Sequence, residues 1–367
     1  MNKMIVANLL HRPIRSLISI IAVALEVILI LLIVGLSMGM LNDARTRQEG
    51  IGADVIVTPP GSSFLSGITG APVSIKVADI LRKLPHVKAV APIVTQLTTT
   101  GNVEVIYGID LKNFPLTGPF QYLVGGPFQG PNDALVDDYF ADTNHVKLGD
   151  HIRILNHSFR VSGIVEHGKG ARKYVPLATL QDLIGSQGKV SVFYVKLDNP
   201  NNADLVVKEV RDVPGMQNYT VRSMRDYLSM MTPANLPGFN KFITVVIGVA
   251  VTIGFIVIFQ AMYAAVMERT REIGILKSLG AAKFFILGII EAEAIGLGLG
   301  GSALGIVFSY GAQWLIHRLV PASIEMAIVY EWWPVAAGII VFASILGALY
   351  PGLSAASHDP IEALAYE

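Results

Sequence analysis

Residues 267–283, with the sequence MERTREIGILKSLGAAK, decide how this chain is organised. They join two apolar runs that are each long enough to cross a bilayer, and they concentrate charge that is scarce on either side. The cations Arg269, Arg271, Lys277 and Lys283 predict a cytoplasmic loop, because Lys and Arg next to membrane helices are retained on the cytoplasmic side.

The same residues predict a short helix within this loop. Ile273, Leu276 and Leu279 recur at a spacing of about three, which places them on one apolar edge, and Gly280 then provides a C-terminal stop. An amphipathic helix at the inner face of a membrane is suited to docking a soluble partner. The alternative is an ordinary interhelical loop whose basic side chains snorkel toward water.

The composition is that of an integral membrane protein. The chain has 367 residues, of which 52% are hydrophobic and only 15% are charged, a balance too apolar for a soluble globular protein. The formal net charge is zero, which argues against nucleic acid as a partner. There are no cysteines, so disulfides and thiolate sites are excluded, and the eight histidines form no close pair at metal-ligand spacing.

Four apolar runs are long enough to span a hydrocarbon core of about 30 Å. The first is too long for the apolar part of a signal peptide, and no small-residue cleavage site follows it, so we expect an uncleaved helix. Trp332, Trp333 and Tyr350 lie at the ends of the last run, where amphipathic rings prefer the membrane interface. The four runs are residues 14–41, 242–267, 284–315 and 332–353.

Between the first and second runs the chain changes character. Pro, Gly, Asp and Asn become common, and apolar stretches shorten to strand length over a region large enough for a core of its own. We expect an α+β domain of two lobes here. Its expected strands are residues 53–58, 103–109, 134–136, 151–155, 159–165, 190–197 and 219–222, and its expected helices are residues 77–84, 177–184 and 203–213.

The predicted fold class is therefore an integral membrane α-helical protein of four transmembrane helices, with a large extracytoplasmic α+β domain inserted between helices one and two. Both termini are expected in the cytoplasm, because Lys3, Arg12, Arg15 and the cations of residues 267–283 fall in the expected inner segments, whereas Arg318 is the one cation between the last two runs. The expected segments are a cytoplasmic N-terminus with the first helix (1–41), the outer domain with its stalk (42–238), the second helix (239–267), a cytoplasmic coupling helix (268–283), the third helix (284–316), a short outer loop (317–331), the fourth helix (332–354) and a cytoplasmic tail (355–367).

One stretch has the spacing of a nucleotide-binding loop, but we interpret it as a glycine-rich turn. Residues 163–170 (GIVEHGKG) match G-x-x-x-x-G-K after an expected strand, yet Gly170 stands where a magnesium-binding Ser or Thr is needed. On the expected topology the stretch also lies outside the cytoplasm, away from ATP. The sequence shows no nucleophile elbow, zinc motif or paired-carboxylate signature, so the chain is expected to be non-catalytic.

Three carboxylates, Glu26, Glu291 and Glu293, fall within the expected spans at similar depths. Charged groups in hydrocarbon are costly and usually face the interior of a helix bundle. One interpretation is a proton-sensitive switch at a dimer seam. The favoured one is carboxyls that pack helices, with Gln260 or Ser309 as partners, because the spans offer no Lys, Arg or His to pair with them.

Small residues mark where helices pack closely. Three pairs have the G-x-x-x-G spacing, which lets two helices approach each other but does not say which helix is the partner. These helix-packing pairs are Gly35/Gly39, Gly296/Gly300 and Gly301/Gly305.

Taken together, these features resemble the MacB/FtsX/LolCE-type ABC transporter permeases over nearly the whole chain. One helix, a large outer domain and three further helices match the family's arrangement. Residues 268–281 (ERTREIGILKSLGA) resemble its cytoplasmic coupling segment, and residues 359–364 (DPIEAL) resemble its P-x-x-A-L ending. Further similar stretches are IEA at 290–292, the glycine-rich run 296–305, VKLGD at 146–150, FRVSGIV at 159–165 and YGID at 107–110.

The resemblance implies a permease subunit that binds no cofactor itself. ATP and Mg²⁺ are expected on a separate cytoplasmic ABC ATPase, since this sequence shows no ATP-binding domain. The coupling segment would seat on that ATPase. The residues to which the resemblance assigns this role are Glu268, Arg269, Arg271, Glu272, Ile273, Gly274, Leu276, Lys277, Leu279 and Gly280.

The resemblance also implies a dimer, formed with a second copy or with a related permease. ATP-driven closure of the dimer is expected to pass through the first two helices as a mechanical stroke of the outer domain, and helix extensions at 41–49 and 224–231 fit such a lever. The expected location is the bacterial inner membrane, in contact with lipid, with the large domain in the periplasm. A periplasmic adaptor and an outer-membrane channel are further expected partners.

Three functions are compatible with this arrangement. Export of a hydrophobic, lipid-linked or peptide substrate is favoured, because a two-lobed outer domain is larger than that of the family's cell-wall hydrolase regulators. The alternatives are a signalling module that regulates a hydrolase or a sensor, and extraction of lipoproteins from the membrane.

Overall fold

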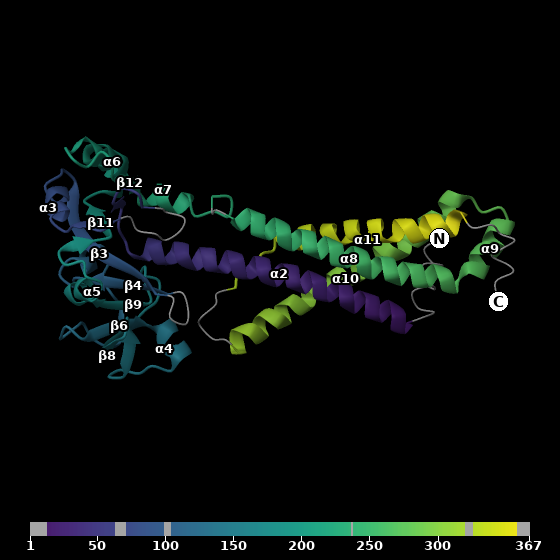
Figure 1. The fold of residues 1–367 in the computed structure, drawn as a ribbon, viewed down its shortest axis with the longest axis horizontal. Coiled ribbons are helices and arrows are strands. Elements are labelled where there is room, and N and C mark those ends of the chain that lie inside the picture. Colours follow the sequence, from purple (N-terminus) through teal and green to yellow (C-terminus); the bar gives the residue numbers. More distant parts are fainter. Residues whose placement is uncertain (1–12, 63–70, 99–103, 236–237, 320–325, 358–367) are drawn as a thin grey trace. The chain divides into compact units, whose positions relative to one another are not determined.

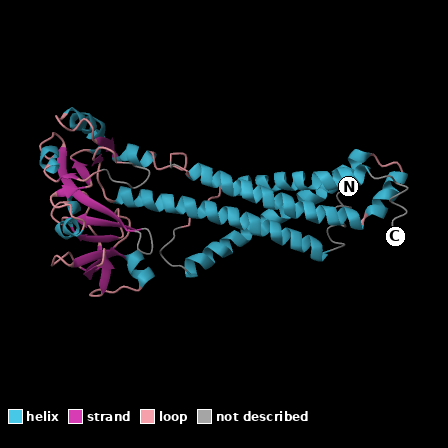
Figure 2. Ribbon diagram, in the orientation of Figure 1, coloured by secondary structure: helices cyan, strands magenta, loops and turns pink. Residues whose placement is uncertain are grey.

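The computed structural model describes residues 13–62, 71–98, 104–235, 238–319 and 326–357 of the chain. These residues fold into two compact units, each treated separately below. The helical unit comprises the described residues of Met1–Met38, Gly238–Leu319 and Met326–Glu367, and the sheet unit comprises those of Gly39–Pro237. Figure 2 shows the long helices gathered in the first and the strands in the second.

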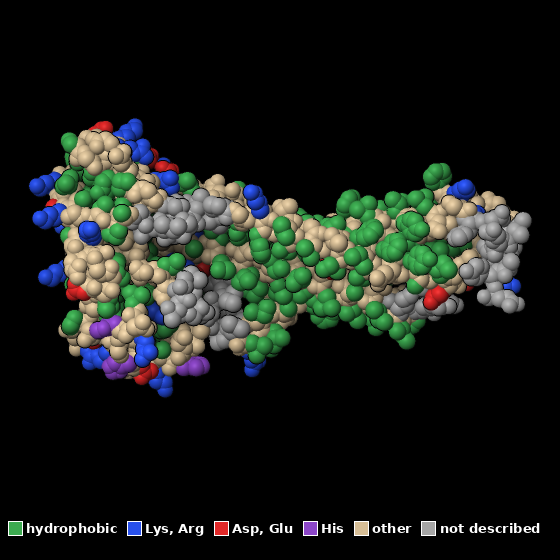
Figure 3. All heavy atoms as spheres, viewed as in Figure 1, with side chains coloured by type: hydrophobic (Ala, Val, Ile, Leu, Met, Phe, Trp, Pro, Cys, Tyr) green, Lys and Arg blue, Asp and Glu red, His purple; other side chains and the backbone are tan. Residues whose placement is uncertain are grey.

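Among the described residues, four helices are long and apolar enough to cross a membrane. Figure 3 shows hydrophobic side chains covering the long helices on the face in view, whereas Lys, Arg, Asp and Glu are concentrated on the sheet unit. The four runs expected from the sequence are thus helices, with bounds that differ by a few residues at most ends. They are α2 (Pro13–Gly50), α8 (Phe239–Glu268), α10 (Lys283–Leu319) and α11 (Trp332–Ser357).

Small residues let these helices pack backbone to backbone. A Cβ atom added at Gly347 of α11 would come within 2.8 Å of the Phe255 carbonyl oxygen in α8. One added at Gly298 of α10 would come within 2.6 Å of Ser344 Oγ in α11. Helices in lipid gain little from apolar burial against one another, so such close van der Waals packing is what holds them together. The short helix α9 (Thr270–Ser278) joins α8 to α10 (Figure 1).

Helix α2 contributes to both units. Its residues up to Met38 belong to the helical unit, and its last turns, which end at Gly50, belong to the sheet unit. The helix extension expected at residues 41–49 is therefore confirmed.

The second expected extension, at residues 224–231, is present as a separate short helix. This helix, α7 (Met224–Ser229), ends before α8 begins. The chain between them contains Pro233, which cannot continue a helix, and Gly238, whose left-handed backbone (φ 79°) opens α8.

The sheet unit is built on one mixed ten-stranded sheet with the order β12-β1-β11-β3-β4-β9-β6-β8-β5, in which β7 pairs with β8, and a two-stranded sheet of β10 and β2. The pairs β4–β9 and β6–β8 are parallel. The strands are β1 (Val55–Thr58), β2 (Val73–Ser74), β3 (Val87–Thr98), β4 (Glu104–Ile109), β5 (Tyr122–Gly125), β6 (Asp133–Asp137), β7 (His151–Ile154), β8 (His157–Val165), β9 (Lys173–Pro176), β10 (Lys189–Val190), β11 (Val192–Leu197) and β12 (Thr220–Ser223).

Each strand expected from the sequence is present, with residue 103 outside the described residues. Strands β2, β3, β5 and β9 and helix α4 were not expected. The expected helices correspond to α3, α5 and α6, which are shorter by up to three residues at their ends. The short helices of the unit are α3 (Val77–Leu81), α4 (Asp138–Asn144), α5 (Leu177–Leu183), α6 (Ala203–Asp212) and α7, with 3₁₀ turns η1 (Phe114–Leu116) and η2 (Pro200–Asn202).

The long strand β3 joins the two halves of the sheet. Its first part pairs with β11 as far as Ile93, and from Val94 onward it pairs with β4. The sequence predicts two lobes. In the structure their strands form one continuous sheet, because β3 pairs with β11 on one side and with β4 on the other. Pro92 argues against a central strand in the sequence, since proline cannot donate to the ladder, but here it lies just before the point where β3 changes partner.

Both faces of the sheet are buried, and alternate residues of each strand reach opposite cores. Val55 and Val57 of β1 belong to one core with residues of α3, α5 and α6, whereas Ile56 belongs to the other. That second core also contains Ile51, which directly follows α2, and Leu228 of α7. The two chain segments that lead to and from the long helices therefore cover the same face of the sheet.

Candidate functional site

Helix α9 occupies the segment on which the sequence places the docking helix. It begins directly after α8, with Arg269 as the residue that ends one helix and precedes the other. Its end has the two hydrogen bonds of a Schellman motif, from the Gly280 N–H to the Lys277 carbonyl and from the Ala281 N–H to the Leu276 carbonyl, both at 3.0 Å. Gly280 has φ 93°, so the expected glycine stop is confirmed.

Two charged side chains fix α9 to the rest of the helical unit. Arg269 Nη1 pairs with Glu293 Oε2 of α10 at 3.3 Å, and the two side chains are only 15% and 5% exposed. Lys277 Nζ donates to the carbonyl of Ala356 in α11 at 2.9 Å. Both ends of α9 are therefore attached to the long helices that follow it in the chain.

The apolar edge expected from the sequence is divided between two sides of α9. Ile273 and Leu276 are half-buried and, with Arg269 and Glu293, line a small cavity of about 60 Å³ between α8, α9 and α10. Leu279, by contrast, is 80% exposed. Two of the three residues of the expected apolar edge thus face the protein's own helices.

The exposed side of α9 carries a different apolar pair, Ile275 and Leu279, of which Ile275 is 45% exposed. Arg271, Ile275 and Leu279 are spaced at i, i+4 and i+8, so they form one stripe. The sequence does not single out Ile275, because the pairs Ile273/Leu276 and Ile275/Leu279 both have helical spacing. Which pair faces the other helices becomes clear only in the fold. Of the remaining assigned residues, Glu268, Glu272 and Gly280 are exposed and Gly274 is buried.

The carboxylates within the long helices have different surroundings. Glu293 is the partner of Arg269, which lies outside the expected spans, so this carboxylate has a basic partner although the spans themselves offer none. Glu26 accepts a hydrogen bond from the Gly254 N–H of α8 at 3.2 Å rather than from Gln260 or Ser309. The carboxyl can approach this closely because residue 254 is a glycine, and any side chain at this position would collide with it.

Some of these carboxylate oxygens are buried without a partner among the described residues. They are Oε2 of Glu26 and both oxygens of Glu291. Buried polar atoms of this kind are costly in hydrocarbon, as they are in any apolar interior.

The glycine pair Gly301/Gly305 of α10 packs on α2 of the same chain. A Cβ at Gly301 would come within 2.6 Å of Val23 Cβ, and one at Gly305 would come within 2.6 Å of Val27 Cβ. At Gly300 the contact with α2 would be an ordinary one, 3.7 Å from Ile20 Cδ1, and Gly296 is half-buried in α10.

The pair Gly35/Gly39 lies on α2. The Gly35 carbonyl accepts from the Ala327 N–H at 2.9 Å, so its tightest contact is with the segment before α11, and a Cβ at Gly35 would also lie 3.7 Å from Gln313 Nε2 of α10. Gly39 is buried.

Enlarging Gly301 is expected to destabilise the helical unit. Leu in place of Gly301 must displace the side chain of Val23 on α2. Overpacking of this kind in a well-packed core lowers the free energy of unfolding by about 1–3 kcal/mol. Thermal unfolding of the purified protein measures the loss. Gly311→Ala is the matched control in the same helix, because nothing lies within 4 Å of its added Cβ, and it should leave stability unchanged or slightly raised. An equal loss in both variants would contradict the packing contact.

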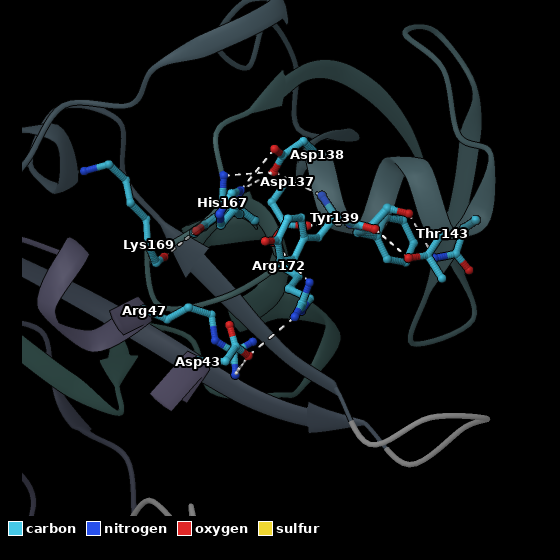
Figure 4. A network of polar contacts seen from close by, with 12 residues as sticks. Asp43, Arg47, Asp137, Asp138, Tyr139, Thr143, His167, Lys169 and Arg172 are labelled. Atoms are coloured by element: carbon cyan, nitrogen blue, oxygen red, sulfur yellow. Dashed lines mark hydrogen bonds and ion pairs between the residues drawn. The ribbon is translucent and has the colours of Figure 1, made fainter. Parts of the chain in front are cut away.

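The sheet unit contains a buried polar cluster around Asp137 (Figure 4). Asp137 is 1% exposed; its Oδ1 caps α4 by accepting from the Phe140 N–H at 2.7 Å, and its Oδ2 lies 3.8 Å from Arg172 Nη1. Burial raises the pKa of this carboxyl to about 6, against the lowering effects of the Phe140 N–H and of Arg172. Next to it, Asp138 pairs with His167 at 3.1 Å, and the His167 ring stacks on Tyr139.

Asp137→Asn is expected to stabilise the sheet unit at pH 8 but hardly at pH 4. The folded pKa of about 6 lies above the usual value of 3.8, so the carboxyl destabilises the fold most above about pH 6, and this cost shrinks as the pH falls from 6 toward 3.8, where the unfolded state also takes up the proton. Asn keeps an acceptor for the α4 cap. We expect the free energy of unfolding to rise by about 1–3 kcal/mol at pH 8, and thermal unfolding at the two pH values measures this gain. A loss of stability at both pH values would contradict the raised pKa of Asp137.

Within the described residues, no group of three or more His, Asp or Glu side chains could hold a metal ion. The stretch 163–170 ends β8 and continues as an irregular loop with Gly168 and Gly170 at positive φ, so its interpretation as a glycine-rich turn is confirmed.

Two protein-family models match the chain. The MacB-like periplasmic core domain matches residues 16–213, and the FtsX-like permease C-terminal model matches residues 244–360.

Similar proteins include an uncharacterized ABC transporter permease of Methanocaldococcus jannaschii, which is 24% identical over 97% of this chain and 95% of its own length. The macrolide export ATP-binding/permease protein MacB of Sodalis glossinidius is 25% identical over 97% of this chain, which spans only 59% of that relative. Among solved structures, the periplasmic region of MacB from Actinobacillus actinomycetemcomitans is similar at 15% identity with a TM-score of 0.40, over 50% of this chain and 94% of that one.

Proposed function

Because this chain belongs to the family of ABC transporter permeases with MacB-like and FtsX-like domains, we propose that it couples ATP hydrolysis by a separate cytoplasmic ATPase to movement of its sheet unit. The movement drives export of a hydrophobic, lipid-linked or peptide substrate on the outer side of the membrane. The MacB relative is described as a macrolide exporter, which supports a hydrophobic compound as the substrate.

The observation that carries this proposal is the construction of α9. The helix exposes Ile275 and Leu279 on one side, and on the other it is fixed by the Arg269–Glu293 pair and by the Lys277–Ala356 hydrogen bond. An exposed apolar pair next to charged side chains suits a groove on a soluble partner. The attachments on the opposite side suit the transfer of force rather than a flexible tether.

The proposed topology places α9 and both chain ends in the cytoplasm and the sheet unit outside it. The four long helices then cross the bacterial inner membrane, and the proposed segments are those expected from the sequence, with helix bounds taken from the structure. The cations Arg271 and Lys283 flank the exposed apolar pair of α9, in keeping with retention of positive charge inside.

In this mechanism the chain itself binds no nucleotide. ATP and Mg²⁺ are bound by the ATPase, whose closure brings two permeases together, and α2 carries the resulting movement outward because it runs without a break from the helical unit into the sheet unit. A second permease, either the same or related, and a periplasmic adaptor with an outer-membrane channel complete the proposed assembly.

Co-purification from native membranes tests the proposal. The tagged chain is isolated in detergent, and its partners are identified by mass spectrometry. An ABC ATPase together with an adaptor and an outer-membrane channel is expected. An ATPase with a cell-wall hydrolase or a sensor kinase would contradict export while keeping the coupling mechanism, and the absence of any ATPase would contradict both.

A further inference from the structure

The loop between β8 and β9 contacts the last turns of α2 within the sheet unit. Arg172 Nη2 donates to Asp43 Oδ2 at 3.4 Å (Figure 4). The Gly170 N–H donates to the Arg47 carbonyl at 2.8 Å. Arg47 in turn pairs with Asp43 at 3.1 Å. The positive φ of Gly170 lets the backbone N–H point at the helix, and a Cβ there would overlap the ring of Tyr107.

The same loop also closes the end of the helix. Lys169 Nζ donates to the carbonyl of Gly50 at 3.0 Å, and a cation at this position is favoured by the negative end of the helix dipole. Lys169 is half-buried, and this burial lowers the pKa of its ammonium group. At Gly50 an added Cβ would overlap the carbonyl oxygen of Gly168, so the loop lies directly against the helix backbone.

These contacts follow one face of α2 in order. Residues 43, 47 and 50 are spaced at i, i+4 and i+7, and their partners in the loop are 172, 170 and 169. The loop therefore runs antiparallel along the last two turns of the helix. Lys169 also belongs to the Gly-Lys dipeptide that gives residues 163–170 the spacing of a nucleotide-binding loop, and here its ammonium group binds the helix carbonyl of Gly50 instead.

A second contact ties the helix end to the sheet itself. Gln48 donates from Nε2 to the Tyr107 hydroxyl of β4 at 3.3 Å and accepts from the Tyr194 hydroxyl of β11 at 2.9 Å. Because β4 and β11 flank β3 on either side, this side chain reaches both halves of the sheet. Ile51, the first residue after α2, is fully buried in the same core as Tyr107 and Tyr194.

We propose that residues 169–172, here termed the α2 clasp, lock the end of α2 to the sheet so that helix and sheet move as one body, with Arg172 as a positioning residue. The inference rests on the proposed function, since it assigns the point at which the movement of α2 enters the sheet unit. Arg172 is suited to this role because it contacts Asp43 on the helix, lies near Asp137 of β6, and stacks over the Tyr139 ring of α4 at 5.1 Å.

Hydrogen exchange of the full chain in nanodiscs, without any ATPase, tests the clasp. In Asp43→Asn and in Arg172→Gln, the backbone amides of residues 44–50 are expected to exchange about tenfold faster than in the unmodified protein. Gly50→Ala, which separates the loop from the helix without removing a charge, should have the same effect. Arg225→Gln is the matched control, because it removes an exposed ion pair with Asp204 elsewhere in the sheet unit, and it should change nothing at residues 44–50. Unchanged exchange in the three clasp variants would overturn the inference.

The role in coupling is tested in the complex with the partner ATPase. The chain has no native cysteine, so Asp43→Cys/Arg172→Cys introduces a single thiol pair that a short bismaleimide can join. Without the cross-linker, ATP should no longer change hydrogen exchange in the sheet unit although ATP hydrolysis continues. With the cross-linker, the ATP-dependent change should return.

The outcomes separate the clasp from the function on which it rests. If ATP has no effect on the sheet unit of the unmodified complex, the proposed function fails, and the clasp is then judged by the exchange of residues 44–50 alone. If the unlinked double variant still responds to ATP, or if the cross-link abolishes the response, the clasp is not the rigid joint proposed here.

Discussion

Replacing Ile275 and Leu279 together by Asp is expected to abolish binding of the partner ATPase while leaving the protein folded. Both side chains are exposed at α9, 45% and 80% respectively, so the substitutions remove little packing within the chain. When the ATPase docks, however, two carboxylates would be withdrawn from water without partners, which costs several kcal/mol. The dissociation constant, measured with the purified ATPase, should rise at least a hundredfold, since each 1.4 kcal/mol is a factor of ten.

Leu205→Asp is the matched control for this pair. It makes the same chemical change at a 47% exposed leucine on α6 of the sheet unit, and ATPase binding should be unaffected. Ile273→Asp with Leu276→Asp provides the contrast, because these side chains face α8 and α10 and the substitutions should lower stability as well as binding. Normal binding by the Ile275/Leu279 variant, or an equal effect of Leu205→Asp, would contradict the assignment of the exposed face.

Arg269→Leu is expected to cost about 3–5 kcal/mol of stability, because it leaves the Glu293 carboxylate buried without its cation. The same change releases the first turn of α9 from α10, so stimulation of ATP hydrolysis by the permease should fall with it. Thermal unfolding of the purified protein and the ATPase activity of the complex measure the two effects.

The double variant Arg269→Leu/Glu293→Leu distinguishes an ion pair from simple packing. With both charges gone, no buried ion remains unpaired, and most of the lost stability should return. If the double variant is as unstable as Arg269→Leu alone, the cost does not come from the unpaired carboxylate, and the pair is not what holds α9.

Much of the helical unit could be predicted from the sequence because its signals are local. Long apolar runs identify membrane helices by length, and Gly280 identifies the end of α9 because only a residue tolerant of positive φ completes its hydrogen bonds. The partner of Glu293 could not be found in this way. Arg269 lies 24 positions away along the chain, outside the expected span, and the pairing exists only because α8 and α10 are folded back on each other.

The limits in the sheet unit have a different cause. Strand β3 was missed because Pro92 normally excludes a central strand, and the rule fails where a strand changes partner. The contacts of residues 169–172 with α2 join segments more than 100 positions apart, and no local pattern reports them. The sequence does show that 163–170 is an unusual glycine-rich turn, but the helix that it binds becomes visible only in the fold.

The central claim is that the exposed face of α9 seats a separate ATPase, and site-specific photo-cross-linking tests it most directly. A photoreactive amino acid is placed at Leu279 in native membranes, and at Ile273 in a parallel experiment. The account predicts an adduct with an ABC ATPase from Leu279 and none from Ile273, whose side chain faces α8 and α10. An adduct from Ile273 but not from Leu279, or adducts only with lipid, would contradict it.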